Sequence, residues 1–274
     1  LVRRSTAVAA GMLLVLSPLS VYHSQQARHY ALLSLLVASY FYLLVRVVVR
    51  GASTGRLVAV VGALLVGFSC HYFFVFVPIG FCLLLLGFGL FDFRNGMIRA
   101  LLVAHLAAAL LCLAYLPLVQ FQMSFKHTHY IPRPVGSDLL SVYRAVFPAG
   151  PFGIIPGWYS RLFDIFYLGL AAAIILFLRT GMAESSQSNR LFSRRGWMAT
   201  FSLSLLLSVA LPFFLSLYAS PIFIKDRYTI IALPSLALTL GMVIEGFAHR
   251  WPRRVALFLA LAPWLPIGLV TLYR

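Results

Sequence analysis

Lys225, Asp226, Arg227 and Tyr228 place two cations beside one acid between two apolar stretches of the chain. A charged group between apolar segments is costly to remove from water, so it usually faces an aqueous cavity or a ligand. The guanidinium group of Arg227 suits a planar or tetrahedral oxyanion such as a phosphate. The alternative is an interfacial cation whose stem lies in the membrane and whose charge pairs with Asp226.

A second polar cluster runs from Ser17 to Tyr30 and is dense in hydrogen-bonding side chains. Gln25, Gln26 and Arg28 offer amide and guanidinium donors that suit sugar hydroxyls and phosphate oxygens. Tyr and His side chains in such a stretch also serve as anchors at the depth of lipid headgroups. Both interpretations stay open at this point.

His71 and Tyr72 lie at a short break between two apolar runs. A His at a helix turn binds a ligand, moves a proton or only bonds the backbone, and its context leaves these uses open. His127 and His129 are two residues apart, so both rings would face the same way on a strand. No third ligand lies near them in the sequence, and we therefore expect neither a metal nor another cofactor.

The composition is that of a membrane protein, with 62% hydrophobic residues, 10% charged residues and a mean hydropathy of +0.95. A formal net charge of +16 would suggest nucleic acid in a soluble chain. Here helix orientation and anionic lipid headgroups explain the excess of Lys and Arg, which argues against nucleic-acid binding. Cys70, Cys82 and Cys112 lack CxxC spacing and are interpreted as small apolar residues.

A helix needs about 20 apolar residues to cross the hydrocarbon layer of a membrane. The sequence therefore predicts an all-α, polytopic transmembrane bundle of about nine spans, which form a single domain over residues 1–274. We place the spans at residues 6–22, 30–49, 57–70, 72–90, 98–118, 162–179, 197–218, 229–247 and 255–272. Ser69 to Tyr72 predicts a tight turn between two helices, with one long kinked helix as the alternative.

Fourteen of the 22 Lys and Arg residues fall on alternate connections at one side, which marks that side as cytoplasmic. They are Arg3, Arg4, Arg46, Arg50, Arg56, Arg94, Arg99, Arg179, Arg190, Arg194, Arg195, Arg250, Arg253 and Arg254. The N-terminus is then inside the cell, and the protein is expected in the plasma or inner membrane. An external loop covers 119–161 and a cytoplasmic linker covers 180–196.

The external loop is expected to carry a short surface helix over 139–147, with Ser137 or Asp138 as its N-cap. Pro234 is expected to bend or interrupt the helix that follows Tyr228. On this topology Arg28, His71 and Arg227 reach the same external leaflet from distant parts of the chain. Such a group of side chains suits a lipid-linked phosphate whose isoprenoid tail runs down an apolar groove between helices.

Three short motifs carry a resemblance to a known family. Ser17-Pro18-Leu19, with Tyr22 through Leu32, resembles the "SP-L-x-x-YSQEAR-x-YAL" stretch of bacterial GT-C-fold glycosyltransferases of the protein-mannosyltransferase and aminoarabinose-transferase superfamily, which is glycosyltransferase family 39-like. His71-Tyr72-Phe73 is similar to the "HYF" turn of that family. Arg227-Tyr228 through Leu233-Pro234 is similar to its "RYLLPALP" helix entry.

The resemblance implies a multi-pass transferase that moves a sugar from a polyprenyl-phosphate carrier to a glycan, lipid or protein acceptor at the external face. Transfer would invert the anomeric carbon and would use no cofactor. Arg227 would contact the leaving phosphate, while Arg28 and Gln25 would orient the sugar or phosphate. The predicted substrate and lipid-phosphate site as a whole comprises Arg28, Gln25, Gln26, His71, Tyr72, Arg227, Lys225 and Tyr228.

The chain departs from the family pattern in two places. Gln26 stands where the family has Glu, so a carboxylate role is lost there. The family places its catalytic carboxylate upstream of the first motif, where this sequence has no counterpart. We therefore expect an N-terminally truncated chain, and the catalytic residue is left unassigned.

Three other functions stay open on the sequence. A polysaccharide polymerase or ligase also combines a long external loop with Arg and His, and a noncatalytic remnant is compatible with truncation. A secondary transporter usually carries ionisable groups near the membrane midplane and shows repeats. Here nearly all charges lie at span ends, with His105 as the main midspan exception.

Overall fold

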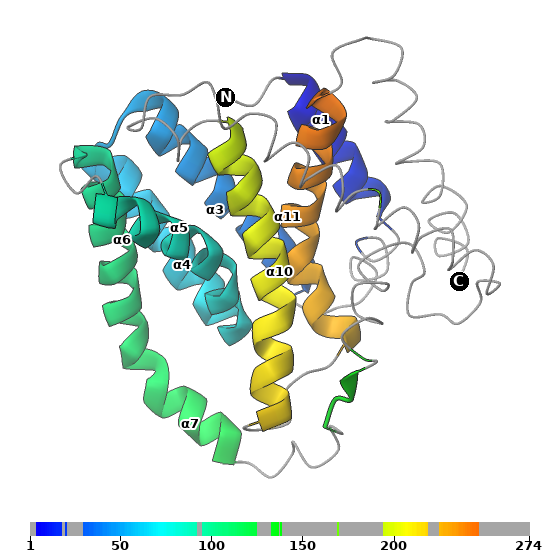
Figure 1. Ribbon diagram of the computed structural model, residues 1–274. Helices are drawn as coiled ribbons and strands as arrows, with labels where there is room; N and C mark the ends of the chain where they lie inside the picture. The colour runs from blue at the N-terminus through cyan, green and yellow to red at the C-terminus, as the bar shows by residue number, and fades with distance from the viewer. Residues whose placement is uncertain are drawn as a thin grey trace.

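The computed structural model describes residues 4–17, 20, 30–91, 95–124, 133–136, 138, 169, 194–218 and 225–246. Within those ranges the regular structure is helical, without strands (Figure 1). The elements are α1 (Arg4–Leu16), α3 (Tyr30–Arg50), α4 (Thr54–Cys70), η1 (Tyr72–Val75), α5 (Phe76–Phe91), α6 (Gly96–Cys112), η2 (Leu113–Tyr115), α7 (Leu116–Ser124), α10 (Arg194–Tyr218) and α11 (Lys225–Gly246).

Three segments are long and apolar enough to cross a membrane: Tyr30–Arg50, Gly96–Leu118 and Gly196–Tyr218. Shorter apolar helices cover Thr54–Cys70, Tyr72–Gly87 and Ile230–Ile244. A helical membrane protein is thus confirmed at this coarse level. The count of nine spans stays a prediction, because the expected spans 162–179 and 255–272 lie outside the described residues, apart from Gly169.

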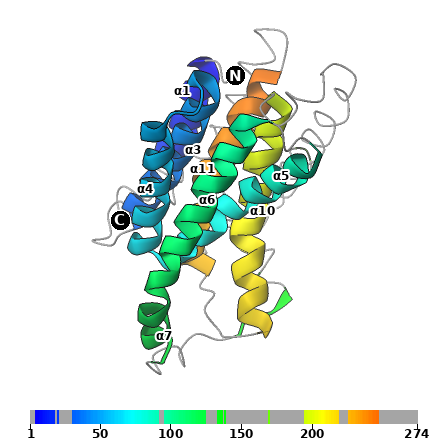
Figure 2. The same cartoon turned by 90° about the vertical axis from the view of Figure 1, so that its left-hand side faces the viewer.

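Helix α11 lies inside the bundle, where it packs against α1, α3 and α10 (Figures 1 and 2). Almost every residue from Ile230 to Ile244 is buried, including the hydroxyl residues Ser235 and Thr239. Helix α10 also packs on α5, and α4 joins α3 to α6. A helix buried all round must have apolar or small side chains on every face, which is the pattern of α11.

Aromatic rings join three of these helices in the core. The Phe41 ring of α3 meets the Phe201 ring of α10 edge-on, with centroids 5.1 Å apart. Trp197 of α10 stacks on Phe81 of α5 at 6.0 Å and on Phe201 at 5.6 Å. Large apolar side chains are also exposed, among them Val58, Val103, Leu106, Leu110 and Phe121. Apolar residues both inside and outside are expected when lipid is the surrounding solvent.

The chain reverses between α3 and α4 at Gly51, whose φ of 82° lies in the left-handed region that favours glycine after a helix end. Arg56 fixes this reversal, because its Nη1 donates to the carbonyls of Arg50, at 2.8 Å, and of Gly51. The end of α3 and the starts of α4, α6 and α10 lie at the same end of the bundle, the upper end in Figure 1. These helix ends carry Arg50, Arg56, Arg99 and Arg194. We call this end the basic end.

The tight turn predicted at Ser69 to Tyr72 is confirmed, and the single kinked helix is wrong. Helix α4 ends at Cys70, His71 is extended with φ −161° and ψ 122°, and the chain re-enters helix at Tyr72. One extended residue is enough to redirect the chain into α5. The end of the bundle that holds His71 and the start of α3 is called the junction end.

Several predicted boundaries are wrong. Helix α1 ends at Leu16 and not at residue 22, because Ser17 precedes Pro18, which disfavours helical backbone at the residue before it. Helix α7 continues to Ser124, so the loop placed at 119–161 begins later. Helix α10 begins at Arg194, which shortens the linker placed at 180–196.

Two local expectations also change. Asp138 is helical and not an N-cap: its carboxylate accepts a hydrogen bond from the Val135 backbone N–H at 2.8 Å, as an acid within a first turn does. The helix expected over 139–147 lies outside the described residues. Pro234 does not interrupt its helix, since α11 runs through it. Close packing by neighbouring helices allows a membrane helix to tolerate the lost backbone bond.

Glycine at position 80 allows α5 to approach α10 closely, and this generates a stability prediction. A Cβ added at Gly80 would lie 2.7 Å from the Ser204 backbone nitrogen, which cannot move aside. Gly80→Ala should therefore lower the stability by ~1–3 kcal/mol, as overpacking does. Gly87→Ala on the same helix meets nothing within 4 Å and is the control. Equal thermal unfolding temperatures of the two variants in detergent would contradict the packing.

Candidate functional site

His71 bonds the backbone on both sides of the α4–η1 turn. Its backbone N–H donates to the Gly67 carbonyl at 3.0 Å, and its own carbonyl accepts from the Phe74 N–H at 2.8 Å. The ring Nδ1 accepts from the Phe73 backbone N–H at 3.2 Å. Because Nδ1 is the acceptor, a neutral His71 ring carries its proton on Nε2. The ring therefore has a structural role in the turn.

Four aromatic residues, Tyr30, His71, Tyr72 and Phe73, gather at this turn, and we call them the aromatic junction. The His71 ring centroid lies 5.0 Å from that of Tyr72, 5.2 Å from Phe73 and 6.2 Å from Tyr30. Tyr30 is the first residue of α3 and is only 4% exposed. The junction thus ties the start of α3 to the end of α4.

Tyr115 of η2 meets the same end of α4. Its hydroxyl and that of Ser69 are hydrogen-bonded at 2.8 Å, and the Ser69 hydroxyl lies 2.8 Å from the Leu65 carbonyl. A carbonyl only accepts, so the single Ser69 proton goes to Leu65 and Tyr115 donates to Ser69. The Tyr115 ring also packs edge-on against Phe68, with centroids 5.6 Å apart.

An apolar groove with a volume of about 390 Å³ begins beside this contact and runs between α4, α5 and α6. We call it the junction groove. It is lined by Leu64, Phe68, Phe74, Val75, Pro78, Ile79, Cys82, His105, Ala108, Ala109, Cys112, Leu113 and Leu116. Along α6 and its continuation the lining runs from His105 to Leu116, about 16 Å at 1.5 Å per residue. This is roughly half of a hydrocarbon layer of about 30 Å.

His105 closes the deep end of the junction groove and is 7% exposed. Its Nδ1 lies 2.7 Å from the Leu101 carbonyl, and its Nε2 lies 2.8 Å from the Tyr40 hydroxyl. Because the carbonyl only accepts, a neutral ring keeps its proton on Nδ1, and Tyr40 then donates to Nε2. Both ring nitrogens are engaged, so His105 links α3 to α6 and is not placed to act as a base.

The first turn of α11 holds the basic motif. Lys225, Arg227 and Tyr228 lie in helix and not in the loop that the sequence suggested, because α11 begins at Lys225. Figures 1 and 2 place this start at the junction end, where α3 begins and α4 ends. The backbone therefore brings the Arg227 segment and His71 to the same end of the bundle.

Gln25, Gln26 and Arg28 lie outside the described residues. Their segment leads into Tyr30, whose ring belongs to the aromatic junction. Of the eight predicted site residues, the structure describes His71 and Tyr72 with their side chains, and Lys225, Arg227 and Tyr228 by their place in α11. The common location of all eight residues stays a prediction.

Sequence reasoning missed three tyrosine contacts. The Tyr30 ring packs near His71, Tyr40 is hydrogen-bonded to His105, and Tyr115 is hydrogen-bonded to Ser69. The partners of Ser69 and His105 are 46 and 65 residues away along the chain. The only sequence signal for these contacts was a tyrosine within or beside an apolar run. Among the described residues no group of three or more His, Cys, Asp and Glu side chains forms a metal site, and none of Cys70, Cys82 and Cys112 forms a disulfide.

No protein-family model, curated protein sequence or solved structure matches this chain.

The buried Tyr40–His105 pair generates a stability prediction. Tyr40→Phe leaves the His105 Nε2 acceptor buried without its donor, which should cost ~1–3 kcal/mol. Tyr42→Phe is the matched control, because Tyr42 lies on the same helix and is 59% exposed. Thermal unfolding in detergent measures both variants.

A double variant separates this hydrogen bond from packing. In Tyr40→Phe with His105→Leu both partners are apolar, so the second change should cost far less than it does alone. Additive losses of unfolding temperature would show that the two side chains contribute independently.

Proposed function

We propose that the protein is a membrane glycosyltransferase that binds a polyprenyl-phosphate-linked sugar at the junction end and transfers the sugar to an acceptor at that membrane face. The observation that supports this most is the shared position of three predicted segments. The start of α3, the His71 turn and the first turn of α11 all lie at one end of the bundle. An apolar groove begins at the same end.

The phosphate would bind at the start of α11. Cations in a first turn oppose the helix dipole, which disfavours each by ~0.3–1 kcal/mol in the absence of an anion. Lys225 and Arg227 both occupy that turn, with Asp226 as the one acid between them. An anion at this terminus interacts favourably with the dipole and with both cations. A bound anion would therefore explain why two cations lie in this first turn.

The isoprenoid tail would occupy the junction groove. The groove is apolar and leaflet-deep, and it begins where Phe68 and Leu116 approach the Ser69–Tyr115 contact. A tail there places its phosphate at the membrane surface near the aromatic junction. Tyr72 and the Nε2 edge of His71 would then border the sugar, as polar groups on rigid elements do in ligand pockets.

Transfer would proceed by one displacement. The acceptor hydroxyl oxygen attacks the anomeric carbon, and the bond from that carbon to the phosphate oxygen breaks. The leaving polyprenyl phosphate keeps the electron pair and is stabilised by Arg227 and Lys225. The hydroxyl proton passes to a carboxylate base, which we do not assign to a residue of this chain.

Donor binding tests the role of Arg227 without requiring that base. The chain in detergent should bind polyprenyl phosphate more tightly than the neutral polyprenol of equal length. Arg227→Gln should weaken phosphate binding by at least about tenfold, since a hydrogen bond to a charged group contributes ~1.5–3 kcal/mol. Binding of the alcohol should stay unchanged, as measured by ligand-induced shifts of the unfolding temperature.

Arg46→Gln is the control for net charge, because Arg46 lies toward the other end of the bundle. An equal loss of phosphate binding in the two variants would mean that total charge and not a site at α11 attracts the ligand. An Arg227→Gln chain that still prefers the phosphate as strongly as the unchanged chain would refute the proposed contact.

A second variant tests the tail position. Ala109 lines the junction groove and is exposed, so Ala109→Phe fills space without disturbing the core. Binding of polyprenyl phosphate should weaken about tenfold, which is the loss expected for roughly two buried methylene groups. Ala107→Phe is the matched control, because Ala107 lies two residues away and outside this groove. Equal effects of the two variants would contradict a tail in the junction groove.

A further inference from the structure

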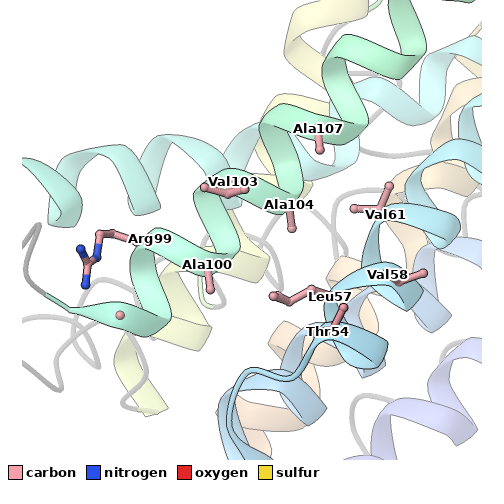
Figure 3. Close-up of a pocket in the computed structure, with 10 residues that line it drawn as sticks. Thr54, Leu57, Val58, Val61, Arg99, Ala100, Val103, Ala104 and Ala107 are labelled. Atoms are coloured by element: carbon pink, nitrogen blue, oxygen red, sulfur yellow. The ribbon is translucent and has the colours of Figure 1, made fainter.

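A second groove lies between the same two helices at the basic end. Its volume is about 670 Å³, and it is formed by the N-terminal halves of α4 and α6 (Figure 3). It is lined by Thr54, Leu57, Val58, Val61, Gly96, Arg99, Ala100, Val103, Ala104 and Ala107. Figure 3 shows Leu57 and Val61 directed toward Ala100 and Ala104 across the groove. The small side chains on α6 leave this space open.

The depth of this groove matches one lipid leaflet. Its lining runs along α6 from Gly96 to Ala107, twelve residues that span about 16 Å at a rise of 1.5 Å per residue. Half of a hydrocarbon layer of about 30 Å is nearly the same length. Helices α4 and α6 both begin at the basic end, so the groove extends from the membrane surface to about the midplane. It is therefore in reach of an acyl chain of that leaflet.

The rim of the groove is positively charged. Arg99 contributes to the groove lining and is exposed, and Figure 3 shows its side chain on the side of α6 turned away from α4. Arg56 lies in the first turn of α4 and donates to the Arg50 and Gly51 carbonyls. The first amides of α6 are already bonded, since Asn95 Oδ1 accepts from Met97 N–H at 3.0 Å and from Ile98 N–H at 3.4 Å. An anion here is therefore held by side-chain cations and not by the helix terminus.

We propose that this groove binds one anionic phospholipid of the basic-end leaflet. One acyl chain lies along Val58, Val61 and Val103, and the headgroup phosphate lies at Arg99. Charge complementarity selects the anionic headgroup, because a basic rim at the membrane surface attracts it over a zwitterionic one. The site does not depend on the proposed transferase, whose donor is assigned to the opposite end of the bundle.

Lipid-dependent stability tests this site. The purified chain in neutral detergent is titrated with phosphatidylglycerol, with phosphatidylcholine of the same acyl chains, and with soluble glycerol phosphate. Phosphatidylglycerol should raise the unfolding temperature more than phosphatidylcholine does, and glycerol phosphate should have no effect. Arg99→Gln should weaken phosphatidylglycerol binding about fivefold, the contribution of one cation near an anionic surface.

Two controls separate this site from general effects. Arg46→Gln removes a cation outside the groove and should leave phosphatidylglycerol binding unchanged. Ala107→Phe fills this groove and should abolish the preference for phosphatidylglycerol, whereas Ala109→Phe, in the junction groove, should preserve it. Equal losses in Arg99→Gln and Arg46→Gln would overturn the proposal, as would stabilisation by glycerol phosphate alone.

Photo-crosslinking tests the location directly and needs no variant. Phosphatidylglycerol with a photoreactive acyl chain, placed in bilayer nanodiscs with the chain, should label peptides that contain residues 54–61 and 96–107. Excess unlabelled phosphatidylglycerol should remove this labelling, whereas phosphatidylcholine should not. Labelling spread evenly over all exposed apolar helices would overturn the proposal.

Discussion

The absence of water from the hydrocarbon layer is the constraint on which this structure depends. A chain that turns at the edge of this layer is stabilised when it bonds its own backbone groups, because lipid chains offer no hydrogen-bond partners. His71 meets this requirement with one residue: its N–H, its carbonyl and its Nδ1 are all bonded within the turn. The turn is therefore compact, and the short helix η1 connects α4 to α5. The junction groove is the space that this geometry leaves between α4, α5 and α6.

The same constraint explains the buried polar pairs. Tyr40 and His105 satisfy each other across two helices, and the His105 Nδ1 is satisfied by a carbonyl of its own helix. Hydroxyl residues inside α10 and α11 do this locally: Thr200 donates to the Gly196 carbonyl and Thr239 to the Ser235 carbonyl, each at 2.8 Å. These four side chains thus find their hydrogen-bond partners within the bundle. This separates the inside of the bundle from its two ends, where the charged residues gather.

Local sequence signals predict some elements of this fold, whereas contacts between distant residues are found only in the structure. Length and hydropathy predict α3 within a residue, and the polar break at Ser69 to Tyr72 predicts the turn, since both signals are local. Local signals also account for some misses, such as the early end of α1 before Pro18. The Tyr40–His105 and Ser69–Tyr115 bonds join residues far apart along the chain, so only the packing of α3, α4 and α6 reveals them. The grooves are likewise spaces between side chains and have no sequence signature.

The two grooves between α4 and α6 differ in a way that follows from where each one opens. The junction groove contains aromatic side chains and opens beside tyrosine and histidine, whereas the groove at the basic end is lined by alanine and valine and opens beside Arg99. An isoprenoid chain is methyl-branched and unsaturated, and aromatic walls provide more contact area for it than alanine walls do. A saturated acyl chain needs only a smooth apolar channel and a cation at the surface. If both proposals hold, α4 and α6 contribute to the binding of two chemically different lipids, one in each leaflet, because the residues at their two ends differ.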